Sequence, residues 1–328
     1  MNIKELGEFG FIDAIKDNTL FNPGPVVIGI GDDGAVYKTT DGMEQVAVID
    51  TMVENSHFII GKTATWYDAG YKAVASNLSD IAAMGAVPTH IILSTAIAPD
   101  MDSAELIELY RGIKDICRQY KVNILGGDTV MSQEGMVITV AAFGEVEAGK
   151  AVRRSGAQAG DIVAASHTLG DSGAGLDVFL HGADGFSRLK KAHALPEPQV
   201  ELGRFLVKHH CHSLNDISDG LASESNEIAK ASRVDLILQK ERIPLSDELQ
   251  HWAKLADKDP YAYALTGGED YELVFTLRPD DFAALQRDCD YVTPIGTVEA
   301  GNGTVWLETD GVRNVLPPVG WTHFSEEA

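Results

Sequence analysis

Short apolar runs alternate with stretches in which apolar residues recur at helical spacing, and this alternation continues along the whole chain. Runs of about five apolar residues predict strands, whereas apolar positions that recur every three or four residues predict helices. The pattern predicts strands at residues 26–30, 46–49, 90–98, 122–125, 136–146, 162–166, 214–217, 234–238, 271–277, 291–298 and 304–308. It predicts helices near residues 3–17, 63–84, 102–120, 199–209, 220–231 and 280–289, and another after the glycine-rich turn at 169–176.

Strands and helices are mixed in both halves, so the predicted fold class is α/β, of the α+β type. The 328 residues are enough for two domains, each with its own core. A loop at residues 149–161, which contains Arg153 and Arg154, interrupts the pattern. We therefore expect one domain at residues 1–150 and a second at 151–328. The chain contains no internal repeat and no low-complexity segment.

Composition narrows the function classes. With 26 Lys and Arg against 49 Asp and Glu, the chain carries a net charge of −23, which would repel the phosphates of nucleic acid. No apolar run is long enough to span a bilayer. The first residues lack the basic-then-apolar order of a signal peptide, and the three cysteines are far apart and odd in number, which favours reduced thiols. We therefore expect a cytoplasmic protein that binds neither nucleic acid nor membrane.

The most informative stretch is the apolar run at 26–30, which leads directly into Gly31, Asp32, Asp33 and Gly34. Paired carboxylates are hard oxygen ligands for a divalent cation, and the flanking glycines let the backbone turn tightly. Acidic residues recur after apolar runs or in glycine-flanked turns at Asp50, Asp80, Asp128, Asp216, Asp219, Glu269 and Asp270. This repetition of acids and turns predicts a site for Mg²⁺ or Mn²⁺ built from oxygen ligands.

Some of these acids have simpler explanations. Asp80 falls near the end of a predicted helix, where the helix dipole disfavours a carboxylate, and it could equally lie on a polar surface. Ser218 or Asp219 could be the N-cap of the helix that follows. Asp216 and Asp219 around Ser218 nevertheless supply more oxygen atoms than one cap requires. Ligand and structural roles therefore both remain open for these residues.

The opening stretch also contains a competing motif. Gly29, Gly31 and Gly34 form the G-x-G-x-x-G pattern of a dinucleotide-binding loop, and Asp50 follows at about the spacing expected of a ribose-binding acid. The two aspartates inside this loop would, however, repel a pyrophosphate. The residues that follow, 35–42, predict a short strand and a turn where the motif requires a helix. A nicotinamide-dependent oxidoreductase is therefore the weaker hypothesis.

The chemistry that best suits the remaining residues is phosphoryl transfer. The chain contains neither a Walker A sequence nor a G-x-S-x-G nucleophile elbow. It combines many carboxylates and several glycine loops with few cations, among them Lys72, Arg153 and Arg154. Phosphoryl transfer needs positioning and charge neutralisation by Mg²⁺ more than it needs a protein nucleophile. The residues by themselves therefore predict a metal-dependent enzyme that acts on phosphorylated substrates.

Seven motifs follow one another over nearly the whole chain. They are residues 31–33 (GDD), 50–58 (DTMVENSHF), 71–86 (YKAVASNLSDIAAMGA), 126–129 (GGDT), 154–157 (RSGA), 216–221 (DISDGL) and 267–273 (GGEDYEL). In this order they resemble the motifs of the thiamine-monophosphate kinase family. That family shares a superfamily with aminoimidazole-ribonucleotide synthetase, selenophosphate synthetase and the hydrogenase-maturation carbamoyl dehydratase. The chain lacks the C-terminal cysteine of the dehydratase, and its first cysteine is Cys117, whereas selenophosphate synthetase has a reactive residue near its N-terminus.

The resemblance implies ATP-dependent phosphorylation of thiamine monophosphate to thiamine diphosphate, by direct in-line transfer assisted by several Mg²⁺ ions. It also implies an N-terminal α/β domain that pairs with its twin in a dimer barrel, and a C-terminal α/β domain that closes the active site. The expected partners are therefore ATP, thiamine monophosphate and a second copy of the chain. Another ATP-using enzyme of the superfamily, with a different phosphorylated substrate, is the main alternative.

The resemblance also implies roles for individual residues. The chain has Val48 and Ile49 where many family members carry hydroxyl residues, which leaves open whether a hydroxyl ligand is missing there. Asp33, Asp128 and Arg154 are the expected catalytic residues. The metals would be held by Asp33, Asp50, Asp80, Asp128, Asp216 and Asp219. ATP would contact Gly127, Asp128, Arg154 and Ser218, and thiamine monophosphate would contact His57, Glu269 and Trp321.

Overall fold

The computed structural model describes residues 12, 14–30 and 34–321. Most of the helix expected at 3–17, and the Gly31-Asp32-Asp33 motif with its expected metal ligand Asp33, lie outside the described residues. The chain folds as two compact units, each described here by itself: Met1–Ile81 with Ala86–Gly149, and Ala82–Gly85 with Lys150–Ala328. Within the described ranges, no helix is both long enough and apolar enough to cross a bilayer.

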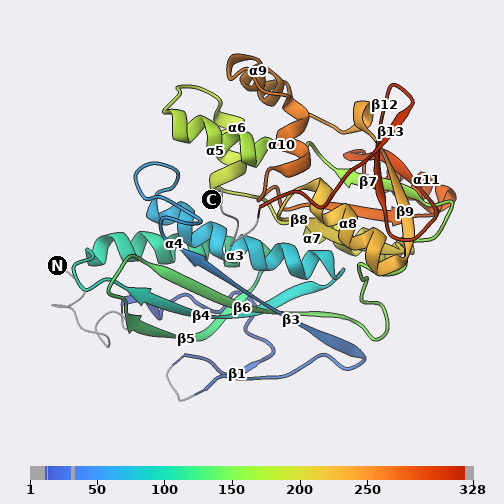
Figure 1. Ribbon diagram of the computed structural model, residues 1–328. Helices are drawn as coiled ribbons and strands as arrows, with labels where there is room; N and C mark the ends of the chain where they lie inside the picture. Colours follow the sequence, from blue (N-terminus) through green and yellow to red (C-terminus); the bar gives the residue numbers. More distant parts are fainter. Residues whose placement is uncertain (1–11, 13, 31–33, 322–328) are drawn as a thin grey trace. The chain divides into compact units, whose positions relative to one another are not determined.

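The first unit is built on a four-stranded sheet in the order β3-β6-β4-β5. Neighbouring strands are antiparallel except β4 and β5, which are parallel and are connected through a helix, as parallel strands require. Two helices, α3 and α4, cover one face of the sheet (Figure 1). The elements are β3 Met43–Val53, α3 Trp66–Ala83, β4 Val87–Ile97, α4 Ser103–Tyr120, β5 Asn123–Met131 and β6 Val137–Glu147, with a small ribbon of β1 Val26–Ile28 and β2 Val36–Tyr37.

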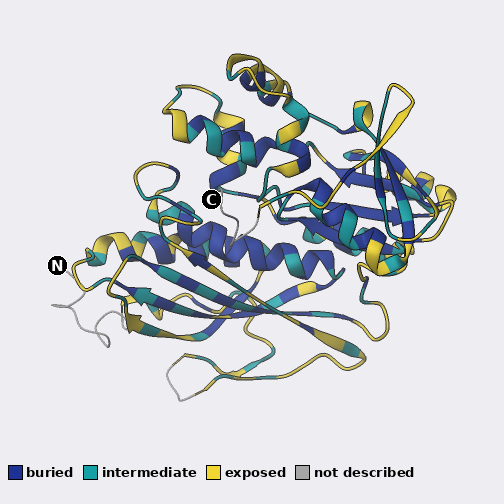
Figure 2. Cartoon of the chain, viewed as in Figure 1, coloured by how far each residue is buried: buried dark blue, intermediate teal, exposed yellow. Residues whose placement is uncertain are grey.

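Buried and partly exposed residues alternate along β6, and this alternation explains how the sheet packs against its helices. Every second residue of this strand is buried, so one face of the sheet is apolar and packs under α3 and α4. Figure 2 shows α3 buried along nearly its whole length. The two helices approach each other at two glycines, where a Cβ on Gly70 would lie 2.1 Å from Leu109 O, and one on Gly112 would lie 2.1 Å from Tyr67 O. Glycine at both positions therefore sets the distance between the helices.

The second unit contains a seven-stranded sheet in the order β13-β12-β9-β11-β7-β10-β8, in which β12 and β9 are the parallel pair. Its two faces have separate cores, one packed against α8 and the other against α7 and α11. The strands are β7 Ile162–Ser166, β8 Ser213–Ile217, β9 Val234–Gln239, β10 Glu272–Leu277, β11 Val292–Ala300, β12 Val305–Thr309 and β13 Val312–Val315. The helices are α5 Asp171–His181, α6 Ser187–Ala194, α7 Val200–Lys208, α8 Leu221–Ser232, α9 Asp247–Leu255, α10 Pro260–Thr266 and α11 Pro279–Asp288.

The α/β fold class predicted from the sequence is confirmed, and most predicted elements occur within a few residues of their expected bounds. The places expected for two of the aspartates were wrong. Asp50 and Asp128 were expected to follow strands, yet they lie inside β3 and β5, because hydrogen bonding to β6 and β4 continues beyond the apolar run. The short strand predicted after Gly34 is confirmed as β2, so the dinucleotide hypothesis lacks the helix that it requires. The helices α6, α9 and α10 and the strand β13 were missed.

Replacing Gly70 by alanine is expected to destabilise the first unit, because the added methyl group would lie 2.1 Å from the Leu109 carbonyl oxygen. Overpacking of this kind costs about 1–3 kcal/mol. Urea unfolding followed by circular dichroism measures the loss. The control is Gly24→Ala, whose methyl group meets no atom within 4 Å, and it should change the unfolding free energy by less than about 0.5 kcal/mol. Equal stability of the two variants would show that α3 and α4 separate without cost.

Candidate active site

Asp50 lies in the middle of β3 on the face that packs under the helices, and it is in contact with α3. Its cross-strand neighbour Val140 is buried, and its carboxylate accepts a hydrogen bond from the Ser76 side chain of α3. Burial raises the pKa of Asp50, while the hydrogen bond from Ser76 and the charge of His57 lower it. His57 Nδ1 accepts a hydrogen bond from the Val53 N–H at 3.0 Å. Two expected site residues, Asp50 and His57, therefore do lie close together.

Asp128 does not join Asp50 within one chain. The strands β6 and β4 lie between β3 and β5. The distance from β3 to β5 across the sheet is therefore roughly 14 Å, at about 4.8 Å between neighbouring strands. The register places Asp128 in the row of Ser94 and Thr139, the row next to that of Asp50, so the two carboxylates point to opposite faces. A metal role shared by the two aspartates stays a prediction that one chain's sheet does not account for.

Gly127 and Asp80 complete the expected residues of the first unit. A Cβ on Gly127 would lie 2.0 Å from Leu93 O, so the packing between β5 and β4 requires glycine there whether or not a nucleotide binds. Asp80 is half-buried in the last turn of α3, which contains no basic residue. The helix dipole disfavours this carboxylate, as expected from the sequence.

The turn after β8 brings together four expected residues of the second unit. Ser218 O accepts a hydrogen bond from Glu269 N at 2.7 Å, and Asp219 O accepts one from Trp321 N at 3.2 Å. Gly220 is the N-cap of α8 and no side-chain hydrogen bond caps this helix. Capping by Ser218 or Asp219, which was the simpler explanation for these residues, is therefore wrong.

Arg154 lies beside the same strand and is held by residues that sequence reasoning missed. Its Nε donates to Asn215 Oδ1 at 3.0 Å, and its Nη1 forms an ion pair with Glu227 at 2.9 Å. The Asn215 amide also donates to Glu224 and Glu227. The two glutamates are three residues apart on α8, and this helical spacing directly after the 216–221 motif was the signal that could have identified them.

The acids near the end of β8 repel one another. Burial raises the pKa of Glu224 to about 9, and the nearby charges of Glu227, Asp216 and Asp219 add to this effect. Asp216 itself is 3% exposed. Burial and the like charges nearby therefore both disfavour the charged form of Glu224, and a cation in this place would favour it.

The donor atoms suit Mg²⁺, but the described residues do not assemble a complete site. Carboxylate oxygens are the ligands that Mg²⁺ prefers, and Glu224 has three acidic neighbours, Glu227, Asp216 and Asp219. Among residues 12, 14–30 and 34–321, however, no three acidic, histidine or cysteine side chains are grouped so that they could hold a metal ion. Of the expected ligands that the structure describes, Asp50, Asp80 and Asp128 belong to the first unit and Asp216 and Asp219 to the second.

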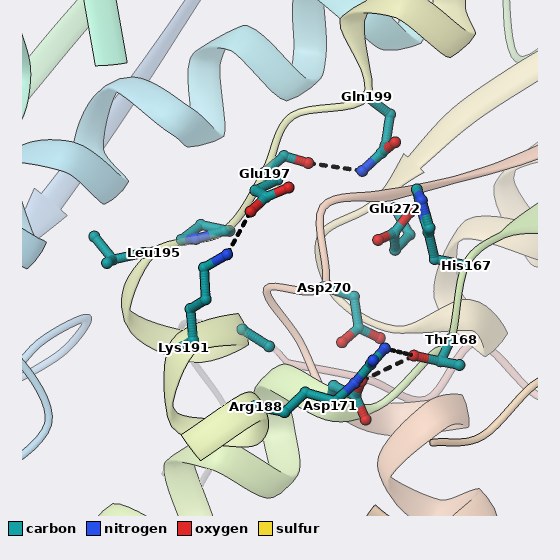
Figure 3. Close-up of a pocket in the computed structure, with 12 residues that line it drawn as sticks. His167, Thr168, Asp171, Arg188, Lys191, Leu195, Glu197, Gln199, Asp270 and Glu272 are labelled. Carbon is teal, nitrogen blue, oxygen red and sulfur yellow. Dashed lines mark hydrogen bonds and ion pairs between the residues drawn. The ribbon is translucent and has the colours of Figure 1, made fainter. Parts of the chain in front are cut away.

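A pocket of about 250 Å³ opens elsewhere in the second unit, and several of its charged side chains are paired with one another (Figure 3). Arg188 Nε donates to Asp171 at 2.9 Å, and His167 Nδ1 lies 3.1 Å from Glu272. Asp270 lines the same pocket and accepts hydrogen bonds from two N–H groups at the start of α5, those of Gly170 and Ser172. Burial raises the pKa of Asp270 well above its usual value. Asp270 thus anchors the loop that carries its neighbour Glu269.

Comparison with known proteins gives one consistent result. Residues 31–146 match the family model of the AIR synthase related protein, N-terminal domain, and residues 158–307 match that of the C-terminal domain. The chain is 35% identical to the thiamine-monophosphate kinase of Bacillus subtilis (strain 168), over 97% of this chain and 100% of the relative.

Two solved structures resemble this one closely. The thiamine-monophosphate kinase of Stenotrophomonas maltophilia K279a has a TM-score of 0.83 and 31% identity, over 93% of this chain and 98% of the other. The structure of AaThiL complexed with AMPPCP and TMP has a TM-score of 0.79 and 34% identity, over 99% of both chains. The similarity therefore extends over both units.

The pair of His167 and Glu272 is expected to make stability depend on pH. The hydrogen bond to Glu272 raises the pKa of His167 above its unfolded value of about 6.5. The stabilisation is therefore complete below about pH 6.5 and is lost as the pH rises through the folded-state value. Because the ring is partly exposed, we expect His167→Gln to lower the unfolding free energy by about 0.5–1 kcal/mol more at pH 5.5 than at pH 9.

Urea unfolding at the two pH values measures this difference. The control is His210→Gln, because His210 is exposed and has the same left-handed backbone, with φ of 57° against 42° for His167. A His167 variant whose loss of stability is the same at both pH values would rule out the ion pair as its cause.

Proposed function

The chain belongs to the thiamine-monophosphate kinase family, within the AIR synthase related proteins, and from this premise we propose that it transfers the terminal phosphoryl group of ATP to thiamine monophosphate. The products are thiamine diphosphate and ADP. Two observations support this reaction. The chain is similar to a thiamine-monophosphate kinase over the full length of that relative, and one similar structure is a complex with AMPPCP and TMP.

The arrangement at the end of β8 is the observation that supports the reaction most directly. Arg154 presents a half-exposed guanidinium beside a group of carboxylates that includes Asp216 and Asp219. A guanidinium neutralises phosphate oxygens, and carboxylates hold the cation that accompanies a nucleotide. The combination suits a site that must hold a nucleotide phosphate on an acidic protein.

The chemistry of the acceptor explains why no general base is needed. Thiamine monophosphate is a phosphate monoester with a second pKa of about 6, so near neutral pH it is already largely ionised. The obstacle is repulsion between two anions. Arg154 offsets part of this charge and helps align the two phosphates for in-line transfer. Transfer is direct, and labelled phosphate trapped on the protein would contradict it.

We propose Mg²⁺ as the cofactor, several ions per site, since every expected ligand is an aspartate. When bound, Mg²⁺ neutralises charge on the transferring phosphoryl group. The protein acts in the cytoplasm. The proposed metal ligands are Asp33, Asp50, Asp80, Asp128, Asp216 and Asp219. The proposed ATP contacts are Gly127, Asp128, Arg154 and Ser218, and the proposed contacts with thiamine monophosphate are His57, Glu269 and Trp321.

The sheet of the first unit supports the proposal of a homodimer. The face away from α3 and α4 carries exposed apolar side chains on three strands, among them Ile49 at 66%, Val130 at 46% and Ile92 at 38% exposure. The strands β3 and β5 are also edges of this sheet. Exposed apolar faces and long strand edges favour association, and a second copy of the chain would cover both.

The activity is tested by following thiamine diphosphate formation from ATP and thiamine monophosphate, with and without MgCl₂. We expect product only with Mg²⁺, and we expect Asp216→Asn to lower kcat/KM by about 100-fold, because it removes charge that holds the cation. Asp100→Asn, on an exposed turn, is the matched control and should retain activity. If the native protein binds ATP but forms no product, the family assignment stands, and the proposal that thiamine monophosphate is the acceptor is contradicted.

The dimer is tested by sedimentation velocity. The native chain should sediment as a dimer, and Ile49→Lys should shift it to monomer, because a charge cannot be buried in an apolar interface without cost. Val312→Lys, at a residue 61% exposed on β13 of the other unit, is the matched control and should remain dimeric. A native chain that sediments as a monomer at micromolar concentration would contradict the proposal.

A further inference from the structure

Two contacts fix the guanidinium of Arg154 from two directions. Nε donates to Asn215 Oδ1 at 3.0 Å, and Nη1 is paired with Glu227 at 2.9 Å. The side chain of Arg154 is 55% exposed in spite of these contacts. Long side chains at such exposure usually sample many rotamers, so the two contacts restrict an otherwise mobile cation.

The orientation of the Asn215 amide follows from its surroundings. Asn215 is 2% exposed, and its Nδ2 donates to the carboxylates of Glu224 and Glu227, the second at 3.1 Å. A flipped amide would turn its NH₂ group toward the Nε–H of Arg154, so that one donor faces another, and its oxygen toward the carboxylate of Glu227. Because both changes are unfavourable, Oδ1 is committed to Arg154.

The backbone around Arg154 is held by the same two elements as its side chain. On β8, Leu214 N donates to Arg153 O at 3.1 Å. At the end of α8, the Ser232 hydroxyl donates to Arg154 O at 3.1 Å and accepts from the N–H groups of Gly156 and Ala157. Main chain and guanidinium therefore have one rigid support, formed by β8 and α8.

We propose that Asn215 and Glu227 are positioning residues, which preset Arg154 so that its remaining terminal nitrogen, Nη2, meets a nucleotide phosphate. The inference rests on the proposed use of ATP. Glu227 carries a negative charge that by itself repels the nucleotide, so a positioning role and a charge role have opposite consequences. An ordered guanidinium loses less side-chain freedom on binding, and this gain exceeds the repulsion from Glu227.

The variant Glu227→Met separates the two roles. Positioning predicts that affinity for AMPPCP, measured by calorimetry with MgCl₂ present, falls about tenfold although a negative charge is removed. Glu227→Gln retains an acceptor for Nη1 and should stay within about threefold of the native value. Glu201→Met, at an exposed glutamate of α7, is the charge-matched control and should bind like the native chain. The Glu227 side chain is 43% exposed, so these variants should fold, and thermal unfolding confirms it.

A double-mutant cycle tests whether Glu227 acts through Arg154. In the Arg154→Ala background, Glu227→Met should cause no further loss of affinity beyond about twofold. In the complete protein, we expect Glu227→Met to raise KM for ATP more than it lowers kcat, and to leave KM for thiamine monophosphate unchanged.

Three results would overturn the positioning role. They are tighter or unchanged AMPPCP binding by Glu227→Met, a loss that persists in the Arg154→Ala background, and a native chain that binds no nucleotide. A different outcome is that the native chain and its Glu227 variants bind AMPPCP with the expected affinities, but the native chain makes no thiamine diphosphate. This result would overturn the proposed acceptor and leave the positioning role in place.

Discussion

Carboxylates that are buried close to one another are the main constraint on the second unit around the end of β8. Burial and the charges of its acidic neighbours raise the pKa of Glu224 to about 9. Within the chain, this repulsion is offset by the amide of Asn215 and the guanidinium of Arg154. A movement of Arg154 away from this place would leave the buried amide oxygen of Asn215 without its partner, at a cost of about 1–3 kcal/mol. The cluster and the arginine therefore stabilise each other's positions.

The loop that carries Glu269 is held to the same strand under strain. Glu269 and Tyr271 have positive φ angles of 67° and 51°, a conformation that costs about 1–3 kcal/mol per non-glycine residue. Their N–H groups donate to Ser218 O and Ile217 O at the end of β8, and Asp270 between them binds the first turn of α5. These bonds determine the backbone of the loop from three sides. The position of Glu269 relative to Ser218 is thus fixed by the fold before any ligand binds.

Sequence reasoning succeeded for elements that their own apolar residues mark. It failed where an element or a contact depends on pairing with a distant part of the chain. The strand at 162–166 was predicted at the bounds that β7 has, because its first four residues are all apolar. The strand β5 was cut short at Leu125, since its continuation to Met131 depends on pairing with β4 and not on apolar residues. The helix α10 was missed although Asp259 and Pro260 form a readable start signal. Asn215 could not be found, because its partner Arg154 is 61 residues away.

Asp50 shows why a local conflict can point to function. Its cross-strand row contains Val140 and Leu93, both buried, and an apolar side chain would fit this row better than a carboxylate. Burial raises the pKa of Asp50, so the folded state works against its charge. The hydrogen bond from Ser76 and the charge of His57 offset only part of this rise in pKa. A serine or threonine at position 50 could accept the same hydrogen bond without burying a charge. This local conflict supports the proposal that Asp50 binds a cation.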